Sequence, residues 1–163
     1  MDEQLYCLPN LVLSFQMTIK SCRDVLLEAL DTIMSPVQTL PCAQGDLDDL
    51  RLALAEALSN AVIHGNREDP DKTVGICAGC DGQSQLLIAV TDQGDGFDPA
   101  VLADPTAAEN ICSSHGRGVF LMRRLVDEVE FNLGGRQVVL RKRIATQLRP
   151  IDVPDSTVRT IDR

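Results

Sequence analysis

The stretch Glu56-Ala-Leu-Ser-Asn60-Ala-Val-Ile-His64-Gly65 carries three polar side chains at intervals of four residues. Residues four apart share one stripe of an α-helix, so Glu56, Asn60 and His64 are predicted to face the same place. Leucines and alanines flank this stripe and allow close packing of the helix: Leu50, Leu54, Leu58, Ala53, Ala57 and Ala61. Taken alone, the stripe fits a solvated helix face better than a binding site, because such patterns are common on exposed helices.

The ends of this helix are predicted from residue types. Asp46 is a good N-cap, and Asp48 and Asp49 suit the positive end of the helix dipole. Gly65 is expected to end the helix in the left-handed conformation.

The chain before this helix predicts a strand and a first helix. Apolar and polar residues alternate over residues 11–19, which indicates a half-buried strand. Ser21 is then expected to cap a helix whose apolar stripe runs on until Pro36 stops it, with its end near Met34.

The chain after it predicts two hairpins with a helix between them. Apolar stretches at residues 73–78 and 86–91 flank a turn-rich segment and form the first hairpin. A helical stripe follows at Leu121, Met122, Leu125, Val126 and Val129. Gly134-Gly135 then separates a short alternating strand from residues 137–143, a pattern typical of a tight primed-turn hairpin.

This order of elements predicts an α/β two-layer sandwich. We expect one mixed, mostly antiparallel sheet covered on one face by about three helices. Residues 1–144 would form the domain. Residues 145–163 hold two prolines and no sustained period, so we expect a flexible C-terminal tail.

Charge and hydropathy exclude several functional classes. The 163 residues include 15 Lys plus Arg against 24 Asp plus Glu, a net charge of -9, which opposes binding to nucleic acid or an anionic membrane. No run approaches the roughly 18 apolar residues of a membrane span, and the acidic start lacks the basic lead of a signal peptide. We therefore expect a cytoplasmic protein.

Six cysteines are spread through the chain, and its apolar content supplies a core without a disulfide framework. Reduced thiols are the prediction. Cys77 and Cys80 have the spacing of half a zinc site or of a redox pair, but no second pair completes it. The competing interpretation is a strand end that enters a turn.

Two glycine-containing motifs follow. Asp92-Gln-Gly94-Asp-Gly96 comes directly after a predicted strand, which places a carboxylate where the backbone can approach a ligand, although an Asp-Gly turn needs no ligand. Gly116-Arg117-Gly118 precedes a predicted helix whose N-terminal N–H groups could cradle phosphate. An ordinary loop-to-helix junction explains this second motif equally well.

The order and spacing of the three motifs resemble the GHKL (Bergerat-fold) nucleotide-binding family. The stretch 56–65 is similar to its N box, 92–99 to its G1 box and 116–124 to its G2 box. Within that family the chain looks most like anti-sigma-factor serine/threonine kinases. The resemblance implies ATP and Mg²⁺ as cofactors and a lid between the second and third boxes.

The resemblance also assigns roles to residues. Asn60 would hold the Mg²⁺ ion, Asp92 would accept from the adenine amino group, and Glu56 would act as the catalytic base. The backbone would close on the nucleotide at four glycines, and Arg117 would stabilise phosphate charge. These glycines are Gly94, Gly96, Gly116 and Gly118.

Two functions follow from this resemblance. The first is a kinase that acts as an anti-sigma regulatory factor and phosphorylates a Ser or Thr of a small anti-anti-sigma (STAS-type) partner. The second is an ATP-gated protein that sequesters a sigma factor or another regulator with little phosphotransfer. The resemblance also implies a homodimer.

Overall fold

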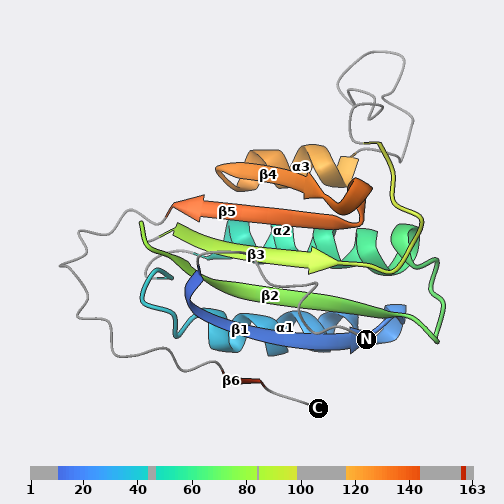
Figure 1. Ribbon diagram of the computed structural model, residues 1–163, viewed down its shortest axis with the longest axis horizontal. Helices are drawn as coiled ribbons and strands as arrows, with labels where there is room; N and C mark the ends of the chain where they lie inside the picture. The colour runs from blue at the N-terminus through green and yellow to red at the C-terminus, as the bar shows by residue number, and fades with distance from the viewer. Residues whose placement is uncertain (1–10, 44–46, 84, 99–116, 144–158, 161–163) are drawn as a thin grey trace.

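The computed structural model describes residues 11–43, 47–83, 85–98, 117–143 and 159–160 (Figure 1). The strands are β1 (Leu11–Lys20), β2 (Thr73–Asp81), β3 (Gln85–Thr91), β4 (Glu128–Asn132), β5 (Gln137–Arg143) and β6 (Arg159–Thr160). The helices are α1 (Leu26–Val37), α2 (Asp48–Ser59) and α3 (Arg117–Leu125). Three short helical turns accompany them: η2 (Arg23–Val25), η3 (Asn60–Gly65) and η6 (Leu133–Gly135).

All six strands belong to one sheet, in the order β4-β5-β3-β2-β1-β6. Neighbouring strands are antiparallel except for β6, which pairs in parallel with β1 at Phe15 and Gln16. Within the segment predicted as a tail, the structure describes only this short strand. The predicted mixed, mostly antiparallel sheet is confirmed.

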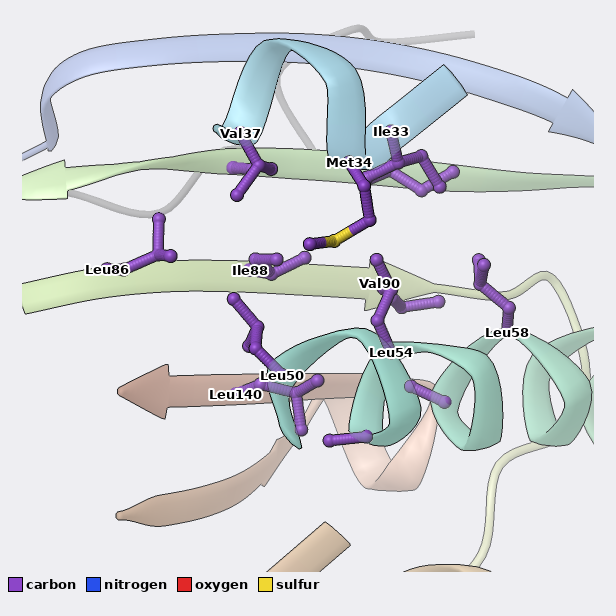
Figure 2. Packing of buried hydrophobic residues seen from close by; sticks show 14 of the residues in the cluster. Ile33, Met34, Val37, Leu50, Leu54, Leu58, Leu86, Ile88, Val90 and Leu140 are labelled. Carbon is purple, nitrogen blue, oxygen red and sulfur yellow. The ribbon is translucent and has the colours of Figure 1, made fainter. Parts of the chain in front are cut away.

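The core lies between the sheet and the three helices. Alternate residues of each strand point to one face, and on β3 these are Leu86, Ile88 and Val90, all buried. Figure 2 shows Leu50, Leu54 and Leu58 of α2 and Ile33, Met34 and Val37 of α1 packed against them. Met122 of α3 joins the same cluster, so the helices share one face of the sheet, as the two-layer prediction requires.

The first helix differs from its prediction at both ends. Pro36 lies inside α1, which runs to Val37. The fully buried side chain of Val37 gives the last turn packing energy that offsets the hydrogen bond lost at proline. Ser21 does not cap the helix, because its side chain is fully buried and its hydroxyl has no hydrogen-bond partner.

The second helix carries the predicted apolar ridges but differs from its prediction at both ends, so only Glu56 of the predicted polar stripe lies in α2, and Asn60 and His64 lie in η3. It begins at Asp48 after Leu47, whose side chain makes no capping bond, and Asp46 lies outside the described residues. Beyond Ser59 the chain continues through Gly65 as the π-helical turn η3. Gly65 is not left-handed, so its role as a cap is wrong, and a different constraint requires glycine there.

The second hairpin also differs from its prediction. Asn132 pairs with Gln137, so four residues connect β4 and β5 where a two-residue turn was expected. Leu133, Gly134 and Gly135 are left-handed, with φ of 53°, 66° and 86°. Phe97 N donates to Gly134 O across this connection, so the loop is shaped to receive a neighbouring segment as well as to reverse the chain.

The prediction of reduced thiols is wrong for two cysteines. Cys42, in the connection from α1 to α2, forms a disulfide with Cys80 of β2, with a Cα–Cα distance of 5.9 Å. Tertiary contact between segments 38 residues apart brings them together, which spacing along the chain does not reveal. Cys77 packs with Ala89 and Val139 on the opposite sheet face, so Cys77 and Cys80 do not form a metal or redox pair.

In the part of the chain that the structure describes, we find no helix long and apolar enough to cross a membrane.

Candidate functional site

A cavity of about 310 Å³ opens between η3, the end of β3, the start of β5, and α3. Its walls are largely apolar and include Val90, Met122, Phe131 and Val138. Its polar lining residues include Asn60, His64, Asp92, Arg67 and Asp95. An apolar cavity of this size with a few convergent polar groups is typical of a small-molecule site.

The helix end of the site consists of Glu56, Asn60 and Gly118. Because α2 and η3 continue one another, Glu56 and Asn60 lie on neighbouring turns that face the start of α3. A Cβ atom on Gly118 would lie 2.8 Å from Glu56 Oε2 and 3.3 Å from Asn60 Nδ2. The absence of a side chain at Gly118 therefore keeps free the space between the α3 backbone and these two polar groups.

The turn end of the site is centred on Asp92, directly after β3. Its Oδ1 accepts a hydrogen bond of 2.8 Å from Gly94 N, and its own backbone N donates to Arg136 O at 2.9 Å. Burial raises the pKa of the Asp92 carboxyl, whereas the Gly94 hydrogen bond and the charges of Arg136 and Lys72 oppose that rise. Asp92 also lines the cavity.

Two glycines let the backbone close around this carboxylate. A Cβ atom on Gly65 would lie 2.4–2.7 Å from the Asp92 carboxylate atoms. A Cβ on Gly94 would lie 2.1 Å from Gly65 O. Gly65, predicted as a helix terminator, is therefore required because Asp92 packs directly against its backbone.

Gly96 meets a different constraint at the same end. Its φ of 76° is left-handed, and a Cβ there would lie 2.1 Å from Gly134 O. The turn that carries Asp92 is thereby packed against the loop between β4 and β5.

Asn66 fixes the turn end, and sequence reasoning did not single it out. Its side chain is fully buried, accepts from Gln93 N at 2.7 Å and donates to Thr73 O at 2.9 Å. Gln93 Oε1 in turn accepts from Thr73 N at 2.8 Å. These bonds join the end of η3, the start of β2 and the turn after β3, so they hold Asp92 in register. The sequence signal that could have pointed to Asn66 is its position directly after His64-Gly65.

The structure brings most of the predicted site residues together. Asn60, Asp92 and Gly96 line the cavity. Glu56 and Gly118 lie beside Asn60, at the edge of the cavity. Gly94 is hydrogen-bonded to Asp92. Arg117 is exposed at the first residue of α3, and Gly116 and the predicted lid lie outside the described residues. Several further lining residues are not among those predicted from the sequence: Arg67, Asp95, Phe97, Val119 and Gly135.

Comparison with known families agrees with this geometry. Residues 23–142 match the model of the histidine kinase-like ATPase domain, which spans both ends of the site. The chain belongs to the histidine kinase-like ATPase family. The resemblance inferred from the three motifs is thereby confirmed.

The similar proteins are named serine-protein kinases and anti-sigma F factors. The chain is 35% identical over 104 residues to the serine-protein kinase RsbW of Bacillus subtilis, covering 60% of this chain and 64% of that protein. It is 35% identical over 94 residues to RsbW of Bacillus licheniformis, covering 54% and 58%. It is 32% identical over 120 residues to the anti-sigma F factor of Clostridium acetobutylicum, covering 70% and 82%. The chain thus spans less than two thirds of the length of the two kinases.

Proposed function

We propose that this chain is an ATP-dependent serine/threonine protein kinase that acts as an anti-sigma regulatory factor. Its substrate would be a Ser or Thr of a small anti-anti-sigma partner of the STAS type, and its downstream target a sigma factor. We further propose that it acts in the cytoplasm as a homodimer. The similarity to proteins named serine-protein kinase and anti-sigma F factor supports this function.

One observation carries the proposal: a carboxylate on α2 faces the open backbone of Gly118 beside an amide that lines the cavity. Glu56 Oε2 and both side-chain heteroatoms of Asn60 lie within 2.8–3.4 Å of the position that a Gly118 Cβ would occupy. A site meant only to bind nucleotide would not need a carboxylate at that position. A kinase needs one there to accept the proton of the attacking hydroxyl.

The residues present fit a nucleotide held through a metal ion. Asp92 lines the cavity, and it would accept from the adenine amino group through the carboxylate oxygen that does not accept from Gly94 N. Asn60 would supply an oxygen ligand to Mg²⁺, a hard cation that prefers oxygen. The metal would offset the repulsion between a triphosphate and a protein of net charge -9.

Bound Mg²⁺-ATP would supply the phosphoryl group, and the protein would position the groups that react. Glu56 would orient the partner's hydroxyl and take its proton. Gly118 would keep the approach open, since a side chain there would displace Glu56. Arg117 and Gly116 would contact the phosphates from the start of α3.

The experiment combines nucleotide binding with label transfer. The full chain is first titrated with ATP in a calorimeter, with and without Mg²⁺. It is then incubated with γ-labelled ATP, Mg²⁺ and a purified STAS-type protein, and the partner is tested for label on Ser or Thr. Binding that requires Mg²⁺ followed by transfer supports the kinase.

The two steps separate the alternatives. Binding of ATP without label on any partner would favour the sequestering function and overturn the kinase assignment. No heat of binding at millimolar ATP would overturn both.

A further inference from the structure

Left-handed backbone is concentrated beside the turn end of the site. Within the described ranges, positive φ occurs at six residues on three short segments: Arg67, Glu68, Gly96, Leu133, Gly134 and Gly135. These segments are joined to one another, because Arg67 pairs with Asp95 and Phe97 N donates to Gly134 O. Positive φ is unfavourable at the three members that are not glycine, Arg67, Glu68 and Leu133, and such residues often cluster at ligand clamps, where the surrounding structure enforces them.

Arg67 and Glu68 are the least expected members of this group. Their φ values of 58° and 56° lie in a region that favours glycine, asparagine and aspartate over long side chains. This conformation follows directly after Gly65 and the buried Asn66, which are fixed against the Asp92 turn. It turns the chain so that Arg67 lines the cavity.

The partner of Arg67 also belongs to the cavity. Arg67 Nη2 lies 3.0 Å from Asp95 Oδ2, and both residues line the cavity next to Asp92. The two side chains are 76% and 84% exposed, and exposed ion pairs contribute little to folding. Stability alone therefore does not account for an arginine held in this conformation at the rim.

We propose that Arg67, oriented by Asp95, is a positioning residue that covers the outer face of the nucleotide base. The inference rests on the proposed function, because it requires a purine base at the turn end. A guanidinium is planar and stacks on aromatic rings, and an aspartate partner fixes the direction of its plane. Asp92 would then hold the edge of the base while Arg67 covers its face.

The test compares Arg67→Ala and Arg67→Lys with the wild type, using Mg²⁺-ATP and Mg²⁺-ADP as probes in calorimetry. Arg67→Ala is expected to weaken both nucleotides by the same factor, about two- to fivefold, the range for an exposed cation–π contact. Arg67→Lys keeps the charge beside Asp95 and can still place a cation over the base, but it lacks the planar face, so it should recover only part of the loss. Asp95→Ala should give a loss no larger than that of Arg67→Ala, because it removes only the orienting group.

The matched control is Arg23→Ala. Arg23 of η2 forms an exposed ion pair of 2.6 Å with Glu68, the residue next to Arg67. Neither Arg23 nor Glu68 lines the cavity. Its loss should leave both affinities unchanged.

Three results would overturn the inference while leaving ATP binding intact: an unchanged affinity in Arg67→Ala, full recovery in Arg67→Lys, or a larger loss for ATP than for ADP. The last would mean that Arg67 contacts the terminal phosphate. A wild type that binds neither nucleotide would overturn the proposed function itself, and this inference with it.

Discussion

The two ends of the site are built by different means. At the helix end, Glu56 and Asn60 project from consecutive turns of one helical segment, and Gly118 leaves them room. At the turn end, Asp92 is held by backbone contacts from Gly65 and Gly94. The first end depends on the spacing of side chains, and the second on how closely three backbone segments approach one another.

This difference has a consequence for substitution. A change at the helix end can alter chemistry while the fold is kept, because the side chains there border open space. A change at the turn end disturbs a packed junction in which Asn66 bonds to two other segments. Variants should therefore separate into those that affect transfer and those that affect nucleotide binding and stability.

The largest expected effect tests the helix end. Glu56→Gln keeps the size of the side chain but removes the proton acceptor, so phosphoryl transfer should slow by about 10²- to 10⁴-fold. Affinity for Mg²⁺-ATP should stay close to the wild-type value, because Asp92 and Asn60 are unchanged. Single-turnover transfer of label, together with calorimetric titration, measures the two quantities separately. Equal rates in both proteins would remove Glu56 from the role of base.

A second experiment asks how much the Cys42–Cys80 disulfide, which tethers the segment that carries α2, adds to stability. The Cys42–Cys80 disulfide closes a loop that contains α2, η3 and most of β2. Cys42→Ala should lower the free energy of unfolding by about 2–4 kcal/mol, the typical contribution of a disulfide, because the bond restricts the unfolded chain. Urea unfolding with and without reductant measures the loss, and the wild type in reductant should match the variant.

Cys22→Ser is the control for that experiment, since Cys22 is a free, half-buried thiol outside the disulfide. It should unfold like the wild type and remain sensitive to reductant. A Cys42→Ala protein as stable as the wild type in oxidising buffer would show that the tether adds nothing to the packing of α2.

The helix end was also the part of the site that the sequence could predict. Regular periodicity fixes which residues share a face, so the sequence could predict the apolar ridges that the core buries and the proximity of Glu56 to Asn60, which both lie beside Gly118. The strands were predicted from apolar patterning of two kinds: alternation over β1 indicates a half-buried strand, whereas β3 is a continuous apolar stretch next to a turn-rich segment. Family resemblance then linked the three motifs into one site.

The turn end could not be predicted in the same way, because its constraints come from segments distant in sequence. Gly65 was interpreted as a helix terminator, although the atoms that require glycine belong to Asp92. The buried role of Asn66 and the pairing of Arg67 with Asp95 also depend on contacts across more than 25 residues. Pro36 and Cys42 were misjudged because packing against the sheet overrides local signals.

A third variant tests the turn end directly. In Asp92→Asn the amide oxygen can keep the hydrogen bond from Gly94 N, which leaves an NH₂ group facing the cavity. A donor opposite the adenine amino group is a mismatch that costs about 1–3 kcal/mol, or roughly 5- to 150-fold in ATP affinity. Calorimetry with ATP measures the loss, and label transfer at saturating ATP should recover. Wild-type affinity in this variant would refute the contact between Asp92 and adenine.

The smallest expected effect is a pH dependence of stability that comes from the same carboxyl. Burial raises the pKa of Asp92 above its ordinary value of 3.8, so the folded protein retains this proton at pH values where the unfolded chain has lost it. The contribution of the Asp92 carboxyl to the free energy of unfolding is therefore fully present below pH 3.8 and is lost as pH rises through the pKa of the folded protein. Asp92→Asn lacks this titration, so its stability relative to the wild type should increase over that range and then level off. Urea unfolding of both proteins across the range measures the difference, which is limited because the carboxyl is only half-buried and solvent screens it. A difference that stays constant with pH would mean that the turn end does not desolvate Asp92, and the packing of Gly65 and Gly94 would then have no electrostatic consequence.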